Sequence, residues 1–223
     1  MSFEGPDEQD YDNVRSLNAG YLTLLRREGK LRRGLQHFAE PLRRRLIELS
    51  PEQHEQLAAT PFLLFSFQEA DDRYWNGMLR ESRDPGLFRS SGSTEVDMLV
   101  AAALGFVWQL SKHNPYALRL ICGGTLYWCE RIADLTFYRL LDAVKASGEV
   151  PSLRLADNGA MWHKLLDDGV SKNRRVRNAA QMAALQAVLT SPVVGQRRES
   201  WSVAAQTVRA PGLWVADGVD RSG

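Results

Sequence analysis

Residues 46–67 read LIELSPEQHEQLAATPFLLFSF, and this stretch decides the fold that the sequence predicts. It contains the clearest helix start in the chain. Ser50 can cap a helix, Pro51 suits the first helical position, and Gln53 stands where a capping box places its reciprocal acceptor. An apolar run follows over residues 62–67. Because the residues on both sides show the spacing of short helices, the sequence predicts an all-α, multi-helix protein.

A first helix is predicted upstream of this stretch, where either Asp10 or Asp12 can act as its cap. Apolar residues there recur at three- and four-residue spacings, which is the pattern of one helix face. These residues are Val14, Leu17, Tyr21, Leu24 and Leu25. Gly29 interrupts the pattern, and the segment over residues 26–45 is strongly basic.

The order of these elements resembles FlhD, the small helical subunit of the bacterial flagellar master transcription activator. The matching pieces are residues 18–24 (NAGYLTL), 46–53 (LIELSPEQ), 57–60 (LAAT), 63–67 (LLFSF) and 71–72 (DD). The resemblance covers roughly the first third of the chain. It implies an all-α protein that oligomerises and acts with a DNA-reading partner subunit, FlhC.

Turn-rich and charged segments divide the chain into five predicted parts. Residues 1–11 are expected to form a disordered acidic tail, and residues 12–82 an FlhD-like helical unit. Residues 83–94 are rich in turn formers and are expected to link this unit to a second helical unit over residues 95–190. Residues 191–223 are expected to form an irregular C-terminal arm.

The second unit is predicted to contain two long helices. Ser93 or Thr94 can cap the first, which runs to His113 and is apolar around most of its circumference, as a central helix would be. The second is expected to run over residues 115–147. The glycine pair at 123–124 lies inside it and predicts a kink or a close helix crossing.

Residues 157–190 have the layout of a helix-turn-helix motif. Asp157 can cap a short helix, a glycine-containing turn follows over residues 168–170, and Ser171 can cap a second helix from Lys172 onwards. The candidate DNA contacts are Lys172, Asn173, Arg174, Arg175, Arg177 and Asn178. Such side chains suit phosphates and base edges in the major groove. An ordinary helical corner with a solvated basic end has the same pattern, and residues 26–45 offer a rival basic surface.

Aromatic and apolar residues provide candidates for a partner interface. From the FlhD-like unit they are Tyr21, Leu24, Leu25, Phe62, Leu64, Phe65 and Phe67. From the second unit they are Tyr116, Tyr127 and Tyr138, spaced eleven residues apart. These three tyrosines run along a polar stripe if the helix over residues 115–147 is continuous. They suit either a partner interface or the edge of an intramolecular helix contact, with their hydroxyls in water.

Composition excludes several classes of protein. The net charge of +1 gives no global reason to bind nucleic acid or anionic lipid. Cys122 and Cys129 are expected to be buried free thiols in a reducing cytoplasm. The longest uncharged stretch, residues 98–111, is too short to span a bilayer, and the acidic N-terminus lacks the features of a signal peptide. Zinc, phosphate-binding, dinucleotide-binding and nucleophile motifs are absent from the sequence, so no cofactor is expected.

These patterns together predict a non-enzymatic transcriptional regulator located in the cytoplasm. It is expected to form a homo-oligomer and to act with an FlhC-like partner subunit on promoter DNA. The alternative is a protein-binding scaffold or adaptor that makes no DNA contact. A helical enzyme would instead require a closed polar pocket around His163 or Glu130.

Overall fold

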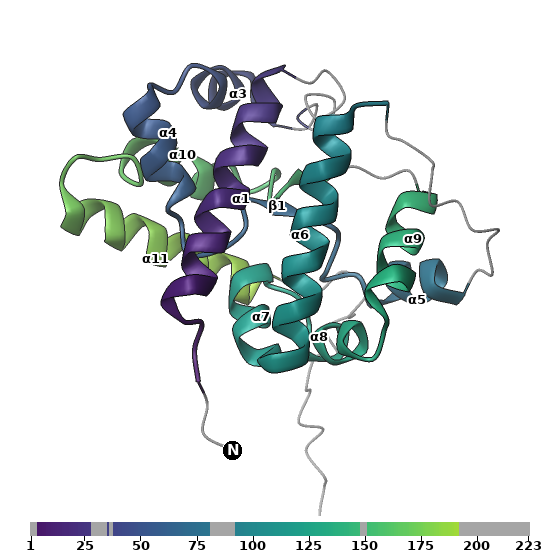
Figure 1. Cartoon of the computed structure of the whole chain (residues 1–223). Helices are drawn as coiled ribbons and strands as arrows, with labels where there is room; N and C mark the ends of the chain where they lie inside the picture. Colours follow the sequence, from purple (N-terminus) through teal and green to yellow (C-terminus); the bar gives the residue numbers. More distant parts are fainter. Residues whose placement is uncertain (1–3, 28–34, 36–37, 81–91, 148–150, 192–223) are drawn as a thin grey trace, which may run out of the picture.

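The computed structural model describes residues 4–27, 35, 38–80, 92–147 and 151–191. Helices account for most of these residues, and the strands among them are two residues long, which confirms the predicted all-α, multi-helix fold (Figure 1). In chain order the elements are α1 (Glu8–Arg27), α3 (Glu40–Ile47), α4 (Pro51–Ala58), β1 (Phe65–Ser66), α5 (Asp72–Arg80), α6 (Thr94–His113), α7 (Pro115–Cys122), α8 (Leu126–Ala133), α9 (Phe137–Ser147), β2 (Ser152–Leu153), α10 (Gly159–Asp167) and α11 (Arg174–Thr190). Within the described ranges, no helix has both the length and the apolar character needed to cross a bilayer.

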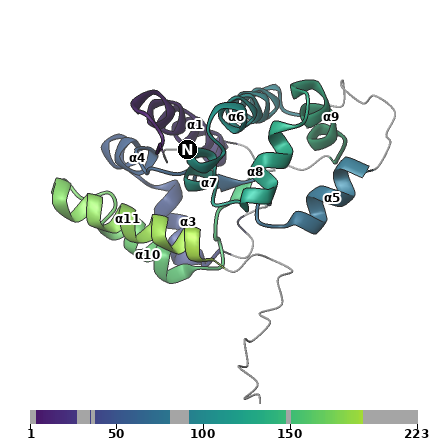
Figure 2. The same ribbon diagram turned by 90° about the horizontal axis from the view of Figure 1, so that it is seen from below.

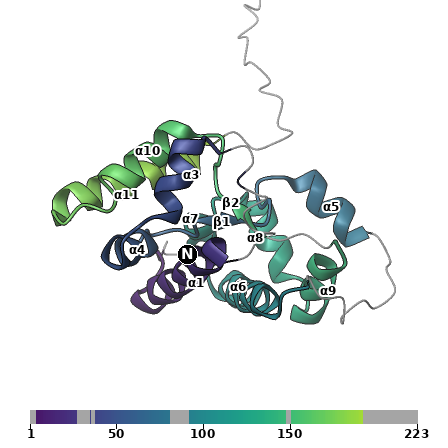
Figure 3. The same cartoon turned by 90° about the horizontal axis from the view of Figure 1, so that it is seen from above.

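The two longest helices, α1 and α6, pack side by side in the middle of the molecule. Helix α4 packs on α1, while α7, α8 and α9 pack on α6. Helices α3, α10 and α11 lie at one end, and α5 lies at the other end against α9 (Figures 2 and 3). The molecule is therefore built outwards from the α1–α6 pair.

One hydrophobic core joins the two predicted units. It includes Tyr21, Phe62 and Trp75 from the first unit and Trp128 and Trp162 from the second. The strands also cross the predicted boundary, because Phe65 of β1 pairs with Leu153 of β2 in an antiparallel register. The predicted linker falls largely on residues 81–91, which lie outside the described residues. Within the described residues, both units contribute to the same packing.

Residues of the FlhD-like stretch meet at the buried Asn18 side chain. Its Nδ2 donates to the carbonyl oxygens of Ala58 and Phe62, at 3.2 and 2.9 Å. Its Oδ1 accepts from the backbone N–H of Leu64 at 2.8 Å. One amide thus satisfies three backbone groups, one at the end of α4 and two in the loop after it, and it ties both segments to α1.

The helix starts confirm some sequence signals and correct others. The capping box of Ser50 and Gln53 is present, and Ser93 accepts from the backbone N–H of Val96. Helix α1, however, begins at Glu8, so residues 8–11 are helical rather than part of a disordered tail. The reason is that Asp7, upstream of both predicted caps, forms a reciprocal pair with Asp10. Asp7 Oδ1 accepts from the N–H of Asp10, and Asp10 Oδ2 accepts from the N–H of Asp7.

The helix predicted over residues 115–147 is instead three helices, α7, α8 and α9, so that prediction was wrong. Gly123 ends α7 in the left-handed conformation, with φ of 66°. At Gly124 an added Cβ would lie 2.9 Å from the Trp128 ring and 3.1 Å from Cβ of Glu69. The glycine pair was predicted to mark a kink or a close helix crossing, and the structure instead shows that the helix ends there, with Trp128 and Glu69 packed against the backbone of Gly124.

A buried ion pair between Arg154 and Glu69 lies beside this glycine pair. Arg154 Nη2 is 3.0 Å from Glu69 Oε1, and both side chains are almost fully buried. The guanidinium also donates to the carbonyl oxygens of Leu63, Phe65 and Cys122. The other carboxylate oxygen of Glu69 accepts from the Ser66 hydroxyl. The pair therefore holds β1, the end of α7 and the segment after β2 in one hydrogen-bonded cluster.

The backbone around this ion pair is strained. Gln68 and Leu155 both have positive φ, at 62° and 48°, and they are the chain neighbours of Glu69 and Arg154. A leucine in this region is a clear outlier, costing roughly 1–2 kcal/mol. Such strain persists only where the surrounding contacts dictate the conformation.

Both cysteines are buried free thiols in the structure, as predicted. Burial raises the pKa of Cys122 well above its usual value, and the nearby Glu69 carboxylate adds to the effect. Burial likewise raises the pKa of Cys129 to about 12, again with a contribution from Glu69. Both groups therefore remain protonated at neutral pH and pack as small apolar side chains.

Removal of one partner of the buried ion pair is expected to destabilise the fold. In Arg154→Met the Glu69 carboxylate stays buried without its cation, so the free energy of unfolding should fall by about 3–5 kcal/mol. Lys172→Met provides the control, because the Lys172–Glu52 pair is exposed and should contribute less than about 1 kcal/mol. Urea denaturation of both variants measures the difference, and equal losses would contradict a special role for the buried pair.

Two glycine-to-alanine changes should have opposite effects on stability. In Gly123→Ala the new Cβ would meet Val188 Cγ1 at 2.4 Å, at a residue with positive φ, so the variant should unfold more easily. In Gly77→Ala the Cβ enters open space on α5, and the variant should gain about 0.4–1 kcal/mol. Thermal unfolding compares the two midpoints with that of the wild type. A shift in the same direction for both variants would contradict the conformation described at Gly123.

Candidate functional site

The corner between α10 and α11 is the predicted DNA-contact region. Asn158 caps α10 by accepting from the N–H of Met161, and Asn173 caps α11 by accepting from the N–H of Arg175. The predicted caps Asp157 and Ser171 were therefore wrong by one and two residues. Ser171 Oγ instead accepts from the N–H of Asn173, which places the asparagine at the cap. The connection spans residues 168–173 and is longer than the three- to four-residue turn of a standard helix-turn-helix motif.

Side chains from α11 close this corner. Arg177 Nη1 donates to the carbonyl oxygen of Ser171 at 2.6 Å. Gln181 Nε2 donates to the carbonyl oxygens of Gln56 and Gly169, at 3.0 and 3.4 Å. An alanine Cβ at Gly169 would lie 2.5 Å from the carbonyl oxygen of Leu165, so the turn requires glycine. The corner is thus a packed unit attached to α4.

The six candidate DNA contacts separate into two groups in the structure. Arg177 closes the corner, Asn173 caps α11, and the exposed Lys172 lies 3.4 Å from Glu52 of α4. Arg174, Arg175 and Asn178 are exposed on the first two turns of α11. The exposed face continues along the helix through Ala179, Met182 and Gln186. Arginine, asparagine and glutamine are side chains that read base edges in the major groove.

The start of α11 concentrates positive charge. The helix begins with Arg174 and Arg175 and has no acidic residue in its first turn. Cations at a helix N-terminus oppose the helix dipole, because that end already carries a partial positive charge. An anion bound there would relieve this repulsion. In all three views the N-terminal end of α11 is at the periphery of the molecule (Figures 1, 2 and 3).

The second basic segment of the sequence meets the same corner. Arg45 of α3 forms an ion pair with Asp167, and its Nη2 donates to the carbonyl oxygen of Leu166 at 2.8 Å. Arg43 and Arg44 are on the same helix, where both pair with Glu40. Residues 28–34 and 36–37 of the rival basic segment lie outside the described residues, so it is Arg45 that connects the basic side chains of this segment to the corner.

A surface groove lies on the α4 side of α11. It has a volume of about 510 Å³ and is lined by Tyr11, Pro61, Arg174, Asn178 and Met182, among others. Tyr11 and Met182 are 41% and 57% exposed. Sequence analysis missed Tyr11, because its role depends on the packing of α1 beside the loop after α4.

The predicted partner-interface residues also separate into two groups. Those of the FlhD-like unit lie in the chain's own core, so they present no surface to a partner in this conformation. These buried residues are Tyr21, Leu24, Leu25, Phe62, Leu64, Phe65 and Phe67. Tyr116, Tyr127 and Tyr138 are 42%, 48% and 52% exposed, and each is on a different helix rather than along one stripe. The Tyr127 hydroxyl accepts from Arg131 Nη1 at 3.0 Å.

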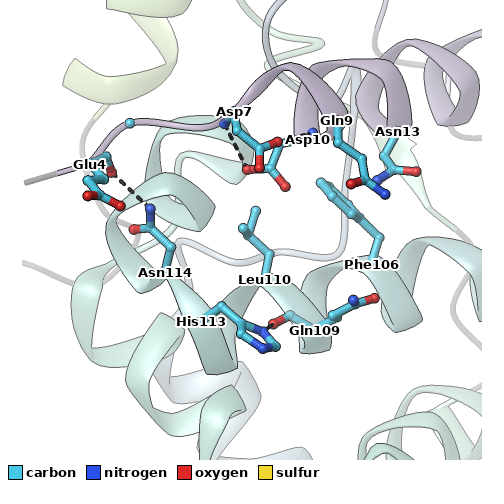
Figure 4. Close-up of a pocket in the computed structure, with 11 residues that line it drawn as sticks. Glu4, Asp7, Gln9, Asp10, Asn13, Phe106, Gln109, Leu110, His113 and Asn114 are labelled. Atoms are coloured by element: carbon cyan, nitrogen blue, oxygen red, sulfur yellow. Dashed lines mark hydrogen bonds between the residues drawn. The ribbon is translucent and has the colours of Figure 1, made fainter.

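A second, more polar pocket of about 520 Å³ lies between the N-terminal end of α1 and the C-terminal end of α6 (Figure 4). Asn114 Nδ2 donates to the carbonyl oxygen of Glu4 at 2.9 Å across one side of it. Asp7 and Asp10 also line it, but their carboxylates are engaged in capping α1. The described residues contain no group of three or more His, Cys, Asp or Glu side chains arranged to hold a metal ion.

Two single substitutions, Asn173→Ala and Ser171→Ala, test which residue caps α11. Asn173→Ala removes the acceptor for the Arg175 N–H, so the free energy of unfolding should fall by about 1 kcal/mol. Ser171→Ala removes only a contact to the cap residue and should cost less. Chemical denaturation ranks the two variants, and a larger loss for Ser171→Ala would restore the cap position predicted from sequence.

The chain matches no protein-family model, no curated protein and no solved structure. Evidence for its function therefore comes from the residues at the α10–α11 corner and on the surfaces described above.

Proposed function

We propose that this protein is a non-enzymatic transcriptional regulator, a co-activator subunit whose α11 helix contacts promoter DNA. In this proposal the protein oligomerises and acts with an FlhC-like partner subunit in the cytoplasm. The observation that carries the proposal is the exposed basic start of α11, which packs against α10, while α10 in turn is held by Arg45 of α3.

The side chains of α11 suit DNA in two ways. Arg174 and Arg175 provide positive charge for phosphate oxygens, and the helix has no acidic residue that would repel them. Asn178 and Gln186 carry amides on the exposed side of the helix, where they can pair with base edges. Arg177 and Gln181 hold the helix at the corner, so the contacting residues stand on a fixed support.

The limited charge of this surface supports the role of a partner subunit. The whole chain has a net charge of only +1, and Arg45 and Lys172 already face carboxylates at the corner. A small number of phosphate contacts gives weak, salt-sensitive binding. A second subunit or a second copy would add contacts, and linked sites bind far more tightly than either site alone.

A protein-binding scaffold is the second candidate function, and the exposed tyrosines favour it. Tyr116, Tyr127 and Tyr138 present aromatic surface from α7, α8 and α9. Arg131 stacks near the Tyr127 ring, with its guanidinium carbon 5.9 Å from the ring centroid. Tyrosine and arginine are enriched at the centres of protein interfaces.

The double change Arg174→Ala with Arg175→Ala tests the proposed DNA contact. The variant of the full chain, together with any subunit that copurifies from its host, should bind a mixed-sequence duplex of about 20 base pairs roughly tenfold more weakly. The slope of log affinity against log salt should fall by about 2, because two phosphate contacts are lost. Fluorescence anisotropy over a salt series measures both quantities.

The matched control is Arg73→Ala with Arg80→Ala, which removes the same charge from exposed positions on α5 at the opposite end of the molecule. This control should leave affinity and salt slope close to those of the wild type. Equal behaviour of the two double variants would remove α11 from the DNA-binding surface and favour the scaffold function.

A further inference from the structure

The groove beside α11 combines apolar walls with polar groups at the start of the helix. Tyr11 of α1 and Pro61 of the loop after α4 form one side, and Met182 of α11 lies along the other. Arg174 and Asn178 also line it, and no acidic residue does. The groove therefore opens directly beside the cationic surface to which the DNA contact is assigned.

These residue types match the needs of a nucleic-acid base outside a duplex. An exposed aromatic ring and a flexible thioether can stack on the faces of a base. An asparagine amide can donate to and accept from its edge. The Arg174 guanidinium can pair with a phosphate of the same strand.

We propose that this groove takes an unpaired base of single-stranded DNA, with Tyr11 as the stacking platform. The inference rests on the DNA contact proposed for α11, and it adds a preference for melted or single-stranded segments at the same surface. A strand whose phosphates pair with Arg174 and Arg175 runs past the groove, so one of its bases lies within reach of Tyr11. Asn178, one turn after Arg174, then lies at the edge of that base.

A protein segment is the other class of occupant that an apolar groove can accept. The continuity of the groove with the basic start of α11 favours nucleic acid. Arg174, one of the two proposed phosphate contacts, also lines the groove, so a strand held there would pass beside it. The charged residue among those that line the groove is Arg174, which matches a single phosphate of a strand.

The test compares two labelled single strands of about 12 nucleotides with equal phosphate charge. One has a mixed base sequence, and the other carries stable abasic sites in place of its bases. By fluorescence anisotropy at one salt concentration, the full-length wild type should bind the base-containing strand at least about fivefold more tightly, because each stacked base adds affinity. Tyr11→Leu should abolish this preference, and Tyr11→Phe should retain it, since phenylalanine keeps the ring.

Duplex binding separates this inference from the proposed function. Tyr11→Leu should bind the duplex as the wild type does, whereas the Arg174→Ala, Arg175→Ala variant should lose affinity for every probe. Thermal unfolding of both Tyr11 variants verifies that they are folded, because part of the Tyr11 side chain is covered by its neighbours.

Equal binding of the two single strands by the wild type would overturn the base-binding proposal, even if duplex binding stayed intact. Tyr11-dependent binding of an acetylated peptide with apolar and acidic residues, without any base preference, would also overturn it and assign the groove to a protein. Absence of duplex binding by the wild type would count against the proposed function instead.

Discussion

The buried Arg154–Glu69 ion pair is the constraint on which the centre of this fold depends. The Arg154 guanidinium donates hydrogen bonds to carbonyl oxygens in the loop before β1, in β1 itself and at the last residue of α7. A buried charge costs free energy unless each donor finds a partner, so these segments must meet in one arrangement. The positive φ angles of Gln68 and Leu155 and the bare backbone at Gly124 are the local consequences, because each permits the close approach that the pair requires. Without this pair, the three segments would lose the hydrogen bonds that hold them together at Arg154.

The same cluster positions the candidate DNA surface. The carbonyl oxygen of Arg154 accepts from the indole N–H of Trp162 at 3.0 Å, which fixes α10 to the core. Helix α10 packs against α11, and Arg45 of α3 pairs with Asp167 at the C-terminal end of α10. The exposed arginines of α11 therefore stand on a support that extends inward to the ion pair. A rigid support of this kind is what a recognition helix needs, because base contacts tolerate little positional error.

The sequence predicted helix starts correctly where the capping pattern depends only on residues close together in the chain. The capping box at Ser50 and the cap at Ser93 are examples, since both depend only on neighbours three residues away. The sequence could not decide which of two nearby polar residues caps a helix. At the start of α11 either Ser171 or Asn173 could act as the cap, and in the structure it is Asn173. The ion pair was invisible, since Glu69 and Arg154 are 85 residues apart and neither is in a recognisable pattern. The apolar run at residues 62–67 supplied candidates for a partner interface, but its apolar side chains are buried in the chain's own core. Which of the two an apolar run does depends on contacts that sequence spacing does not reveal.

The separation of Glu69 from Arg154 along the sequence also bears on how the chain folds during its synthesis on the ribosome. Synthesis at about 5–20 residues per second leaves roughly 4–17 seconds between the emergence of the two side chains. During this time the Glu69 carboxylate must stay hydrated, so the apolar residues around it cannot seal from water. Helices with local contacts, such as α1 against α4, can pair early. The hydrogen bonds at the centre are complete only after β2 and α10 have been synthesised, because Arg154 and Trp162 both contribute to them.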